Sequence, residues 1–204
     1  MPNEGSNPFA TRFIRPGATP YVFPAGVSAE SLVGDLQKQG WRGSIIGPHG
    51  SGKSSLITAL IPALEAAGKQ VVRQQLPGGQ RALDWQSLNP RRWRSSTVVI
   101  IDGYEQLSFW QPLWLQARCL QHGAGLLVTA HQHVRLPILF TTRPTLELAL
   151  SIVQQLLPHS DDRITPADVA EAYAHTQGDL REMLLRLFDV YRAYHGRDAR
   201  DSHS

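Results

Sequence analysis

The chain has 204 residues, 42% of them hydrophobic, which is enough for one domain with a substantial core or for a core with a small appendage. No apolar stretch approaches the roughly 18 residues of a membrane span, and the first residues lack the apolar segment of a signal peptide, so we expect a cytoplasmic protein without a membrane span. The single cysteine, Cys119, cannot form an internal disulfide, and we expect it to be a small core residue. The net charge is +3, and all but three of the 20 basic residues are arginine, a side chain suited to phosphate recognition, so nucleic acid stays an open partner.

After an extended lead-in over residues 1–27, helices and strands are expected to alternate. A serine cap and a terminal glycine predict a helix over 28–40, and the continuous apolar run STVVIID, 96–102, is typical of a strand buried on both faces. Further strands are predicted over 43–47, 70–76, 125–130 and 136–142. Further helices are predicted over 52–67, 82–88, 109–123 and 145–157. Such alternation predicts an α/β fold, with a mainly parallel five-stranded sheet and helices on both faces.

The sequence changes character after Pro158, where no further strand is expected. Two amphipathic helices are predicted over 164–177 and 178–196, the first with Thr165 as its cap and a proline in its first turn. The predicted domain organisation is therefore a core over 28–158, a small α-helical lid over 159–197 and a disordered tail over 198–204.

The stretch GPHGSGKSS follows a predicted strand and opens a predicted helix, which is the context that gives this glycine pattern its meaning. Glycines let backbone N–H groups converge on a polyphosphate, and the helix offers its positive N-terminal end. Lys53 would place a point charge at the β- and γ-phosphates, and the hydroxyl of Ser54 would ligate Mg²⁺. The predicted nucleotide-binding residues are Gly47, Pro48, His49, Gly50, Ser51, Gly52, Lys53, Ser54 and Ser55.

Two acidic residues are candidates for the chemistry. Asp102 ends the buried strand, and a carboxylate there is costly unless it faces a cation, so we assign it to Mg²⁺ through water. Glu105 lies three residues further on, within reach of the same cleft, and is the candidate for orienting the attacking water.

The segments GPHGSGKSS and IIDGYEQL resemble the Walker A and Walker B motifs of P-loop NTPases, and the second has the form found in the AAA+ and STAND branches. The segment TQGDLREMLLRLFDVY is similar to the lid of AAA+-type ATPases, which implies that Arg181 senses the γ-phosphate. The segment GLLVTAH is similar to their sensor strand, with Thr129 at its polar tip. The resemblance implies a P-loop NTPase core followed by a small helical lid, with ATP and Mg²⁺ as cofactors.

The sequence departs from these families at two places. Gly103 follows Asp102, where many AAA+ proteins have a glutamate. No clear arginine finger is present: Arg143 is the candidate, and a structural role for it is expected equally. The segments LPGGQ and LLVTAH also resemble ABC ATPase elements, which would bring His131 to the γ-phosphate, but the spacing before LPGGQ is too short for the ABC helical subdomain.

We therefore expect an ATPase that hydrolyses ATP to ADP and phosphate and acts as a regulatory or partner-remodelling switch. A protein partner is expected, a homo-oligomer stays open, and residues 7–12, NPFATR, are proposed to pack on the adenine. The alternatives are a P-loop kinase acting on a small molecule and an ABC-like nucleotide-binding module.

Overall fold

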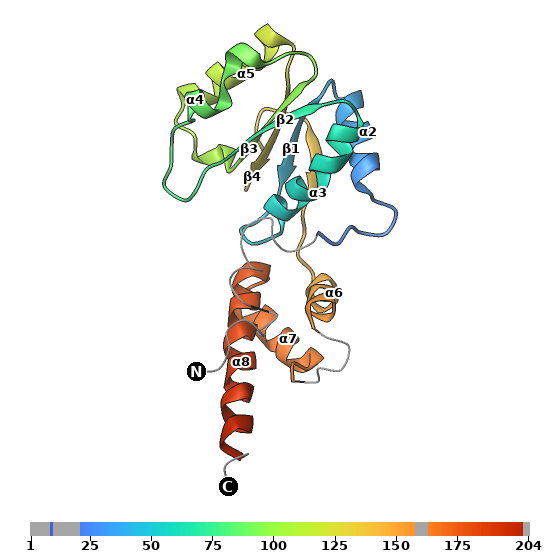
Figure 1. The fold of residues 1–204 in the computed structure, drawn as a ribbon, viewed down its shortest axis with the longest axis vertical. Coiled ribbons are helices and arrows are strands. Elements are labelled where there is room, and N and C mark those ends of the chain that lie inside the picture. Colours follow the sequence, from blue (N-terminus) through green and yellow to red (C-terminus); the bar gives the residue numbers. More distant parts are fainter. Residues whose placement is uncertain (1–8, 10–20, 158–162, 202–204) are drawn as a thin grey trace. The chain divides into compact units, whose positions relative to one another are not determined.

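The computed structural model describes residue 9 and residues 21–157 and 163–201 (Figure 1). Five strands form one sheet: β1 (Arg42–Ile46), β2 (Gln70–Gln75), β3 (Thr97–Asp102), β4 (Gly125–Ala130) and β5 (Ile138–Thr141). The helices are α2 (Ala29–Lys38), α3 (Lys53–Ala66), α4 (Trp85–Leu88), α5 (Trp110–His122), α6 (Leu146–Leu156), α7 (Pro166–His175) and α8 (Leu180–Asp201). Two 3-10 turns, η2 (Pro90–Arg92) and η3 (Tyr104–Gln106), precede β3 and α5.

The sheet has the strand order β2-β3-β4-β1-β5, and every pair of neighbouring strands is parallel. The central strands β3 and β4 are buried along their whole length, because helices cover both faces. The predicted α/β fold is therefore confirmed, with an entirely parallel sheet in place of the mainly parallel one.

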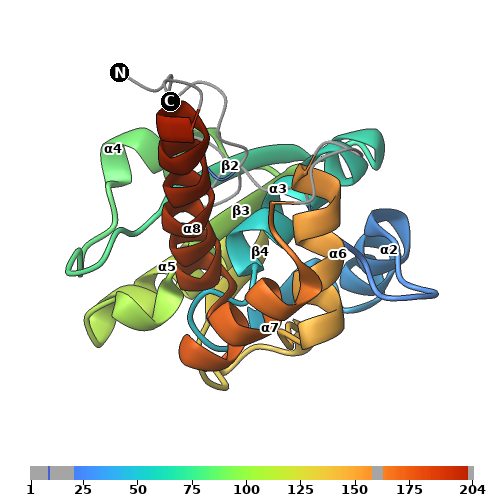
Figure 2. The same ribbon diagram turned by 90° about the horizontal axis from the view of Figure 1, so that it is seen from below.

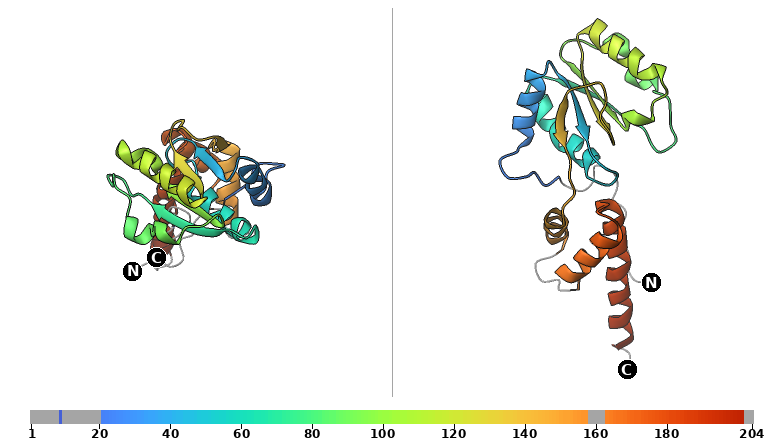
Figure 3. Two further views of the ribbon diagram at one scale, coloured as in Figure 1. Left: turned by 90° about the horizontal axis from the view of Figure 1, so that it is seen from above. Right: turned by 180° about the vertical axis from the view of Figure 1, so that it is seen from behind.

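The two faces of the sheet carry different helices. Val99 and Ile101 of β3 pack with Leu115 and Cys119 of α5 in one hydrophobic cluster. Successive side chains of a strand point to opposite faces, so the side chain of Asp102 points away from α5. Figures 1 and 3 show α4 and α5 on one face and α3 on the other. The prediction that Cys119 is a core residue is confirmed, and burial raises the pKa of its thiol to about 12.

The chain forms two compact units. One contains the sheet, over residues 23–48 and 56–142, and the other contains residues 1–22, 49–55 and 143–204. In the second unit α6, α7 and α8 pack around a core that includes Ile152, Val169 and Leu187 (Figure 2). Since Ala149, Ile152 and Val153 of α6 are buried in this core, α6 belongs with the helical unit and not, as the predicted boundary at 158 has it, with the sheet.

Two further expectations about the helical unit need correction. Phe9 is fully buried, with its ring 5.9 Å from that of Tyr191, so it is a core residue and not a free surface for adenine; most of the NPFATR segment lies outside the described residues. Helix α8 continues to Asp201, into the tail predicted to be disordered. Residues 202–204 lie outside the described part of the chain.

Close packing at Gly125, the first residue of β4, gives a test of the sheet. A Cβ atom there would lie 2.8 Å from both the Cβ and the carbonyl oxygen of Trp41 and 3.2 Å from a methyl group of Val98. We expect Gly125→Ala to lower the free energy of unfolding by about 1–3 kcal/mol, because backbone cannot move aside cheaply. Gly78→Ala is the matched control, since a Cβ there meets nothing within 4 Å, and it should leave the stability unchanged in urea unfolding. Equal stability of Gly125→Ala and the parent would contradict this packing.

Candidate nucleotide-binding site

The predicted phosphate-binding loop connects β1 to α3, the strand-to-helix context that the sequence requires. Gly50 and Gly52 have φ values of 65° and 86°, in the left-handed region that glycine adopts at low cost. Lys53 is the first residue of α3, so Ser54 and Ser55 lie in its first turn, where backbone N–H groups have no partner within the helix. The loop thus has the local geometry in which a helix N-terminus can receive an anion.

Side chains from other segments lie against two glycines of this loop. A Cβ atom on Gly50 would overlap the carboxylate of Asp179, and one on Gly52 would lie 3.6 Å from the ring of Tyr21. Burial raises the pKa of Tyr21 to about 12. Both contacts lie within the helical unit. The overlap with Asp179 excludes a side chain at position 50, whereas the distance to Tyr21 is an ordinary van der Waals contact, so Gly52 is favoured by its left-handed φ alone.

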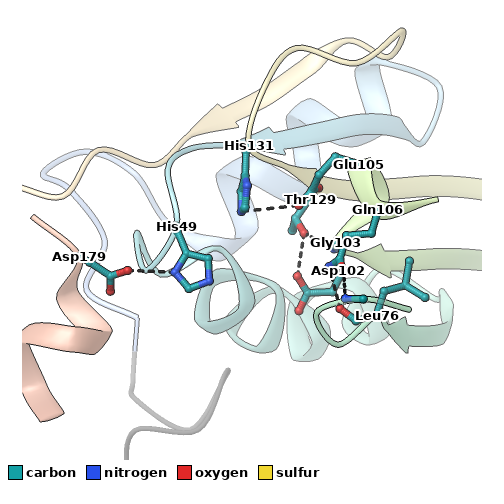
Figure 4. A network of polar contacts seen from close by, with 10 residues as sticks. His49, Leu76, Asp102, Gly103, Glu105, Gln106, Thr129, His131 and Asp179 are labelled. Atoms are coloured by element: carbon teal, nitrogen blue, oxygen red, sulfur yellow. Dashed lines mark hydrogen bonds and ion pairs between the residues drawn. The ribbon is translucent and has the colours of Figure 1, made fainter. Parts of the chain in front are cut away.

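Asp179 links the loop to the start of α8. Its Oδ2 atom lies 2.9 Å from Nδ1 of His49 (Figure 4). Its Oδ1 atom accepts hydrogen bonds from the backbone N–H groups of Arg181 and Glu182. Burial disfavours the charged carboxylate, but the hydrogen bond from His49, the two backbone bonds and the charge of His49 outweigh it and hold the pKa of Asp179 below its ordinary value. Sequence reasoning missed this residue, although aspartate before a helix is a typical N-cap.

Arg181 itself is exposed in the first turn of α8. Its role as a γ-phosphate sensor stays a prediction, but the cap formed by Asp179 fixes the backbone from which its side chain extends. Arg143, the suggested arginine finger, is also exposed, in the segment between β5 and α6.

Asp102 and Thr129 form a buried pair at the carboxyl ends of β3 and β4. Asp102 is 5% exposed, and its Oδ1 atom accepts a hydrogen bond of 2.7 Å from Oγ1 of Thr129. That same Oγ1 accepts a hydrogen bond from the backbone N–H of Gly103 (Figure 4). The hydroxyl of Thr129 therefore joins the two central strands at the edge where ligands bind in parallel sheets.

Arg73 of β2 supplies a cation beside Asp102, at the carboxylate for which sequence alone suggested a metal ion. Its Nη2 atom lies 3.2 Å from Oδ2 of Asp102, and its Nη1 atom donates to Oγ1 of Thr58 in α3. Sequence reasoning overlooked this arginine. Arg73 stands opposite Ile100 in the register of β2 and β3, which places it on the same face of the sheet as Asp102. This register is known only from the structure, so the sequence alone carried no signal for the pair.

The neighbours of Asp102 leave room for metal chemistry. A carboxylate offers about four lone-pair positions, and Thr129 and Arg73 take one on each oxygen, so each oxygen can accept one more hydrogen bond, for instance from a metal-bound water. In the described part of the chain no three or more His, Cys, Asp or Glu side chains gather as a metal site. An ion at Asp102 would thus complete its shell with hydroxyl, water and phosphate oxygens, the ligand set that Mg²⁺ prefers.

The turn after Asp102 explains the departure at Gly103. Its φ is 91°, and a Cβ atom there would lie 2.7 Å from Nε2 of Gln106. That Nε2 donates to the carbonyl of Leu76, and Oε1 of Gln106 accepts from the N–H of Gly79. A glutamate directly after Asp102 would be strained, and Gln106 instead ties the 76–79 turn to the end of β3.

Glu105 and His131 lie together, from different loops. Oε1 of Glu105 is 3.6 Å from Nε2 of His131, and both side chains are partly exposed (Figure 4). A weakly held carboxylate beside an imidazole is able to orient water or to accept a proton from it. The sequence suggested these two residues in competing schemes, whereas the structure places them as a pair.

Comparison with solved structures identifies the fold, although no protein-family model matches the chain. Cdc6p from Pyrobaculum aerophilum aligns over 90% of this chain and 66% of its own, with a TM-score of 0.60 at 13% identity. Hsp104 from S. cerevisiae, in its ADP complex, aligns over 88% and 32% with a TM-score of 0.57 at 15% identity. A RuvB point variant from Thermotoga maritima aligns over 78% and 59% with a TM-score of 0.51 at 16% identity. The chain has the fold of the AAA+ P-loop ATPases.

The likeness has a defined extent. The chain spans from about a third to two thirds of the length of these neighbours, and the low identities make the fold the shared property. The predicted fold, a P-loop core followed by a helical part, is therefore confirmed as a fold. In the described part of the chain, no helix is both long enough and apolar enough to cross a bilayer.

The ion pair of Arg73 and Asp102 should be a large contributor to stability. Arg73→Gln removes the charged partner of a buried carboxylate, so we expect the free energy of unfolding to fall by about 2 kcal/mol or more. In the double variant Arg73→Gln/Asp102→Asn, the loss of unfolding free energy should be smaller than the sum of the losses in the two single variants. Urea unfolding of all four proteins gives this double-mutant cycle. Arg135→Gln, at an exposed position, is the control. Additive effects of the two substitutions would contradict a direct interaction.

The pair of His49 and Asp179 should make stability depend on pH. Because the folded pKa of Asp179 is lowered, its contribution is present above the ordinary aspartate pKa and is lost as the pH falls through the folded pKa. We expect Asp179→Ala to cost about 1 kcal/mol at neutral pH, typical of a lost N-cap, and progressively less below about pH 4.

Asp189→Ala, a change at an exposed aspartate on the same helix, is the control in thermal unfolding followed across this pH range. A cost for Asp179→Ala that stays constant from neutral to acid pH would rule out the charged form as its source.

Proposed function

We propose that the chain is an ATP-binding P-loop ATPase that hydrolyses ATP to ADP and phosphate with Mg²⁺. The observation that carries this proposal is the Asp102 carboxylate, which is buried at the carboxyl end of β3, held by Thr129 and still able to accept further hydrogen bonds. The proposal is supported by the glycine loop between β1 and α3, because β1 lies two strands away from β3 in the same sheet.

The loop from Gly47 to Ser55 would bind the phosphates. Backbone N–H groups of the loop and the first turn of α3 favour an anion, and Lys53 adds a full positive charge at the β- and γ-phosphates. The strand-to-helix context and the left-handed glycines support this role.

Mg²⁺ would be held by the hydroxyl of Ser54 and, through water, by Asp102. The ion supplies charge neutralisation and polarisation of the phosphates when bound. Arg73 orients the carboxylate of Asp102, and its positive charge competes with a cation, so we expect water and not a direct ligand bond between Asp102 and the metal.

Glu105 would orient the attacking water, with His131 holding its carboxylate. Thr129 would hold Asp102 and the Gly103 turn in position beside the reacting phosphate through its two hydrogen bonds. Arg181 would contact the γ-phosphate through a charge-assisted hydrogen bond, so the helical unit would respond to ATP and not to ADP.

The output of such a cycle would be a regulatory or remodelling switch, with a protein partner or further copies of the chain. The AAA+ fold supports nucleotide binding and assembly at the level of the family, and the STAND branch stays a prediction from the second motif. Phosphate release from ATP with no acceptor present separates this proposal from the kinase alternative.

Glu105→Gln tests the proposal most directly. A residue that acts on the water and not on bound ATP should leave the ATP dissociation constant within a few-fold of the parent and lower turnover by about 10²-fold. Asp102→Asn should lower both the affinity for Mg²⁺ and the rate of hydrolysis. Lys53→Ala should abolish both tight ATP binding and turnover.

The measurements are phosphate release and nucleotide binding by calorimetry, with folding checked by circular dichroism. Normal turnover in Glu105→Gln would exclude its role, and His131→Ala would then be the next variant. Normal turnover in Lys53→Ala would place the active site elsewhere.

A further inference from the structure

Helix α5 carries an apolar face that the nucleotide site does not use. The side of α5 with Leu115 and Cys119 packs onto the sheet. On the opposite side, five large apolar residues are exposed: Phe109 (76%), Trp110 (67%), Leu113 (49%), Trp114 (59%) and Leu120 (66%). At 100° per residue they fall within an arc of about 140°. An exposed patch of this size on one helix indicates an interaction surface.

The surroundings of this face are basic. The carbonyl of Arg81 accepts hydrogen bonds from the backbone of Ser108 and the side chain of Gln111, which fixes Arg81 at the start of α5. At the other end of α5, the ring of Trp93 lies 6.5 Å from that of His122. Three exposed arginines flank this tryptophan, and Arg118 adds a further positive charge within α5. The three are Arg91, Arg92 and Arg94.

Acidic residues of the neighbouring segments are engaged in local contacts. Helix α5 itself contains no acidic residue. Asp84 accepts hydrogen bonds from Ser87 and Gln86 at the start of α4, and Glu105 pairs with His131. The complementary partner is therefore apolar and anionic.

We propose that the exposed face of α5, from Phe109 to Leu120, docks the chain onto an anionic lipid bilayer. Tryptophan, phenylalanine and leucine on one helical face, with arginine around them, are the composition of helices that lie in a membrane interface. The apolar side chains insert below the headgroups, and the arginines at both ends of α5 attract anionic lipid.

Two other occupants fit this face less well. Bases of single-stranded nucleic acid stack on aromatic rings, but Leu113 and Leu120 offer no such platform. A second copy seated on the same face would bring the arginines of both copies together without an acidic residue of α5 between them.

Vesicle flotation with the full chain tests this inference. We expect binding to phosphatidylcholine vesicles that contain phosphatidylglycerol, at least about tenfold tighter than to phosphatidylcholine alone, weakened by salt and accompanied by a blue shift of tryptophan emission. Trp110→Gln/Trp114→Gln should lower binding by about tenfold or more. Arg91→Gln/Arg92→Gln should lower it by about fivefold for each charge and reduce the preference for anionic lipid.

Leu185→Gln, at an exposed leucine of α8, is the matched control and should bind as the parent does. Melting temperatures of all variants should match the parent, because the substituted side chains are exposed. Failure of the parent chain to float with anionic vesicles overturns the proposal, as does equal binding of the double tryptophan variant. Binding of an oligonucleotide, or concentration-dependent self-association, that is lost in the tryptophan variant without any vesicle binding assigns the face to those occupants and also overturns it.

Discussion

The buried carboxylate of Asp102 is the constraint on which the centre of the sheet depends. A charge at 5% exposure is costly unless it is paired and hydrogen-bonded. Thr129 from β4 and Arg73 from β2 each bond one of its oxygens, so the strands on either side of β3 are tied to its end by side chains as well as by the sheet. Arg73 in turn reaches Thr58, which adds α3 to the same network. The carboxylate at this position thus also fixes the register of the strands at the carboxyl edge of the sheet, where the nucleotide site is proposed.

The turn after Asp102 extends this hydrogen-bond network to the neighbouring 76–79 turn. Gly103 adopts a left-handed conformation that brings its N–H to Thr129 and leaves room for Gln106. Gln106 then fixes the 76–79 turn through both atoms of its amide. A movement of this turn would also displace Asp102, because the hydrogen bonds of Gly103 and Gln106 connect the two through backbone and planar side-chain groups. The second unit has an analogous link, since Asp179 joins His49, in the predicted phosphate-binding loop, to the first turn of α8.

Helix α5 illustrates how one helix serves two environments. Its inner face completes the apolar core under β3 and β4, and its outer face is also apolar. Such a helix gains little for folding from the outer residues, which stay in contact with water in the isolated chain. Their identity as tryptophan, phenylalanine and leucine is typical of an interaction surface.

The alternation of apolar strands and helices was readable from the sequence, because period and length of apolar runs reflect which faces an element buries. The glycine loop that opens a helix and the place of Asp102 at the end of a buried strand were readable too, because glycines, lysine and a terminal carboxylate at fixed places reflect local backbone chemistry. The pairs of Arg73 with Asp102 and Asp179 with His49 came only from the fold, because they join residues 29 and 130 positions apart. The same holds for α6, whose amphipathic pattern suits either unit and whose place depends on which apolar face it meets. Local pattern specifies an element, whereas its partners are chosen by three-dimensional packing and charge compensation.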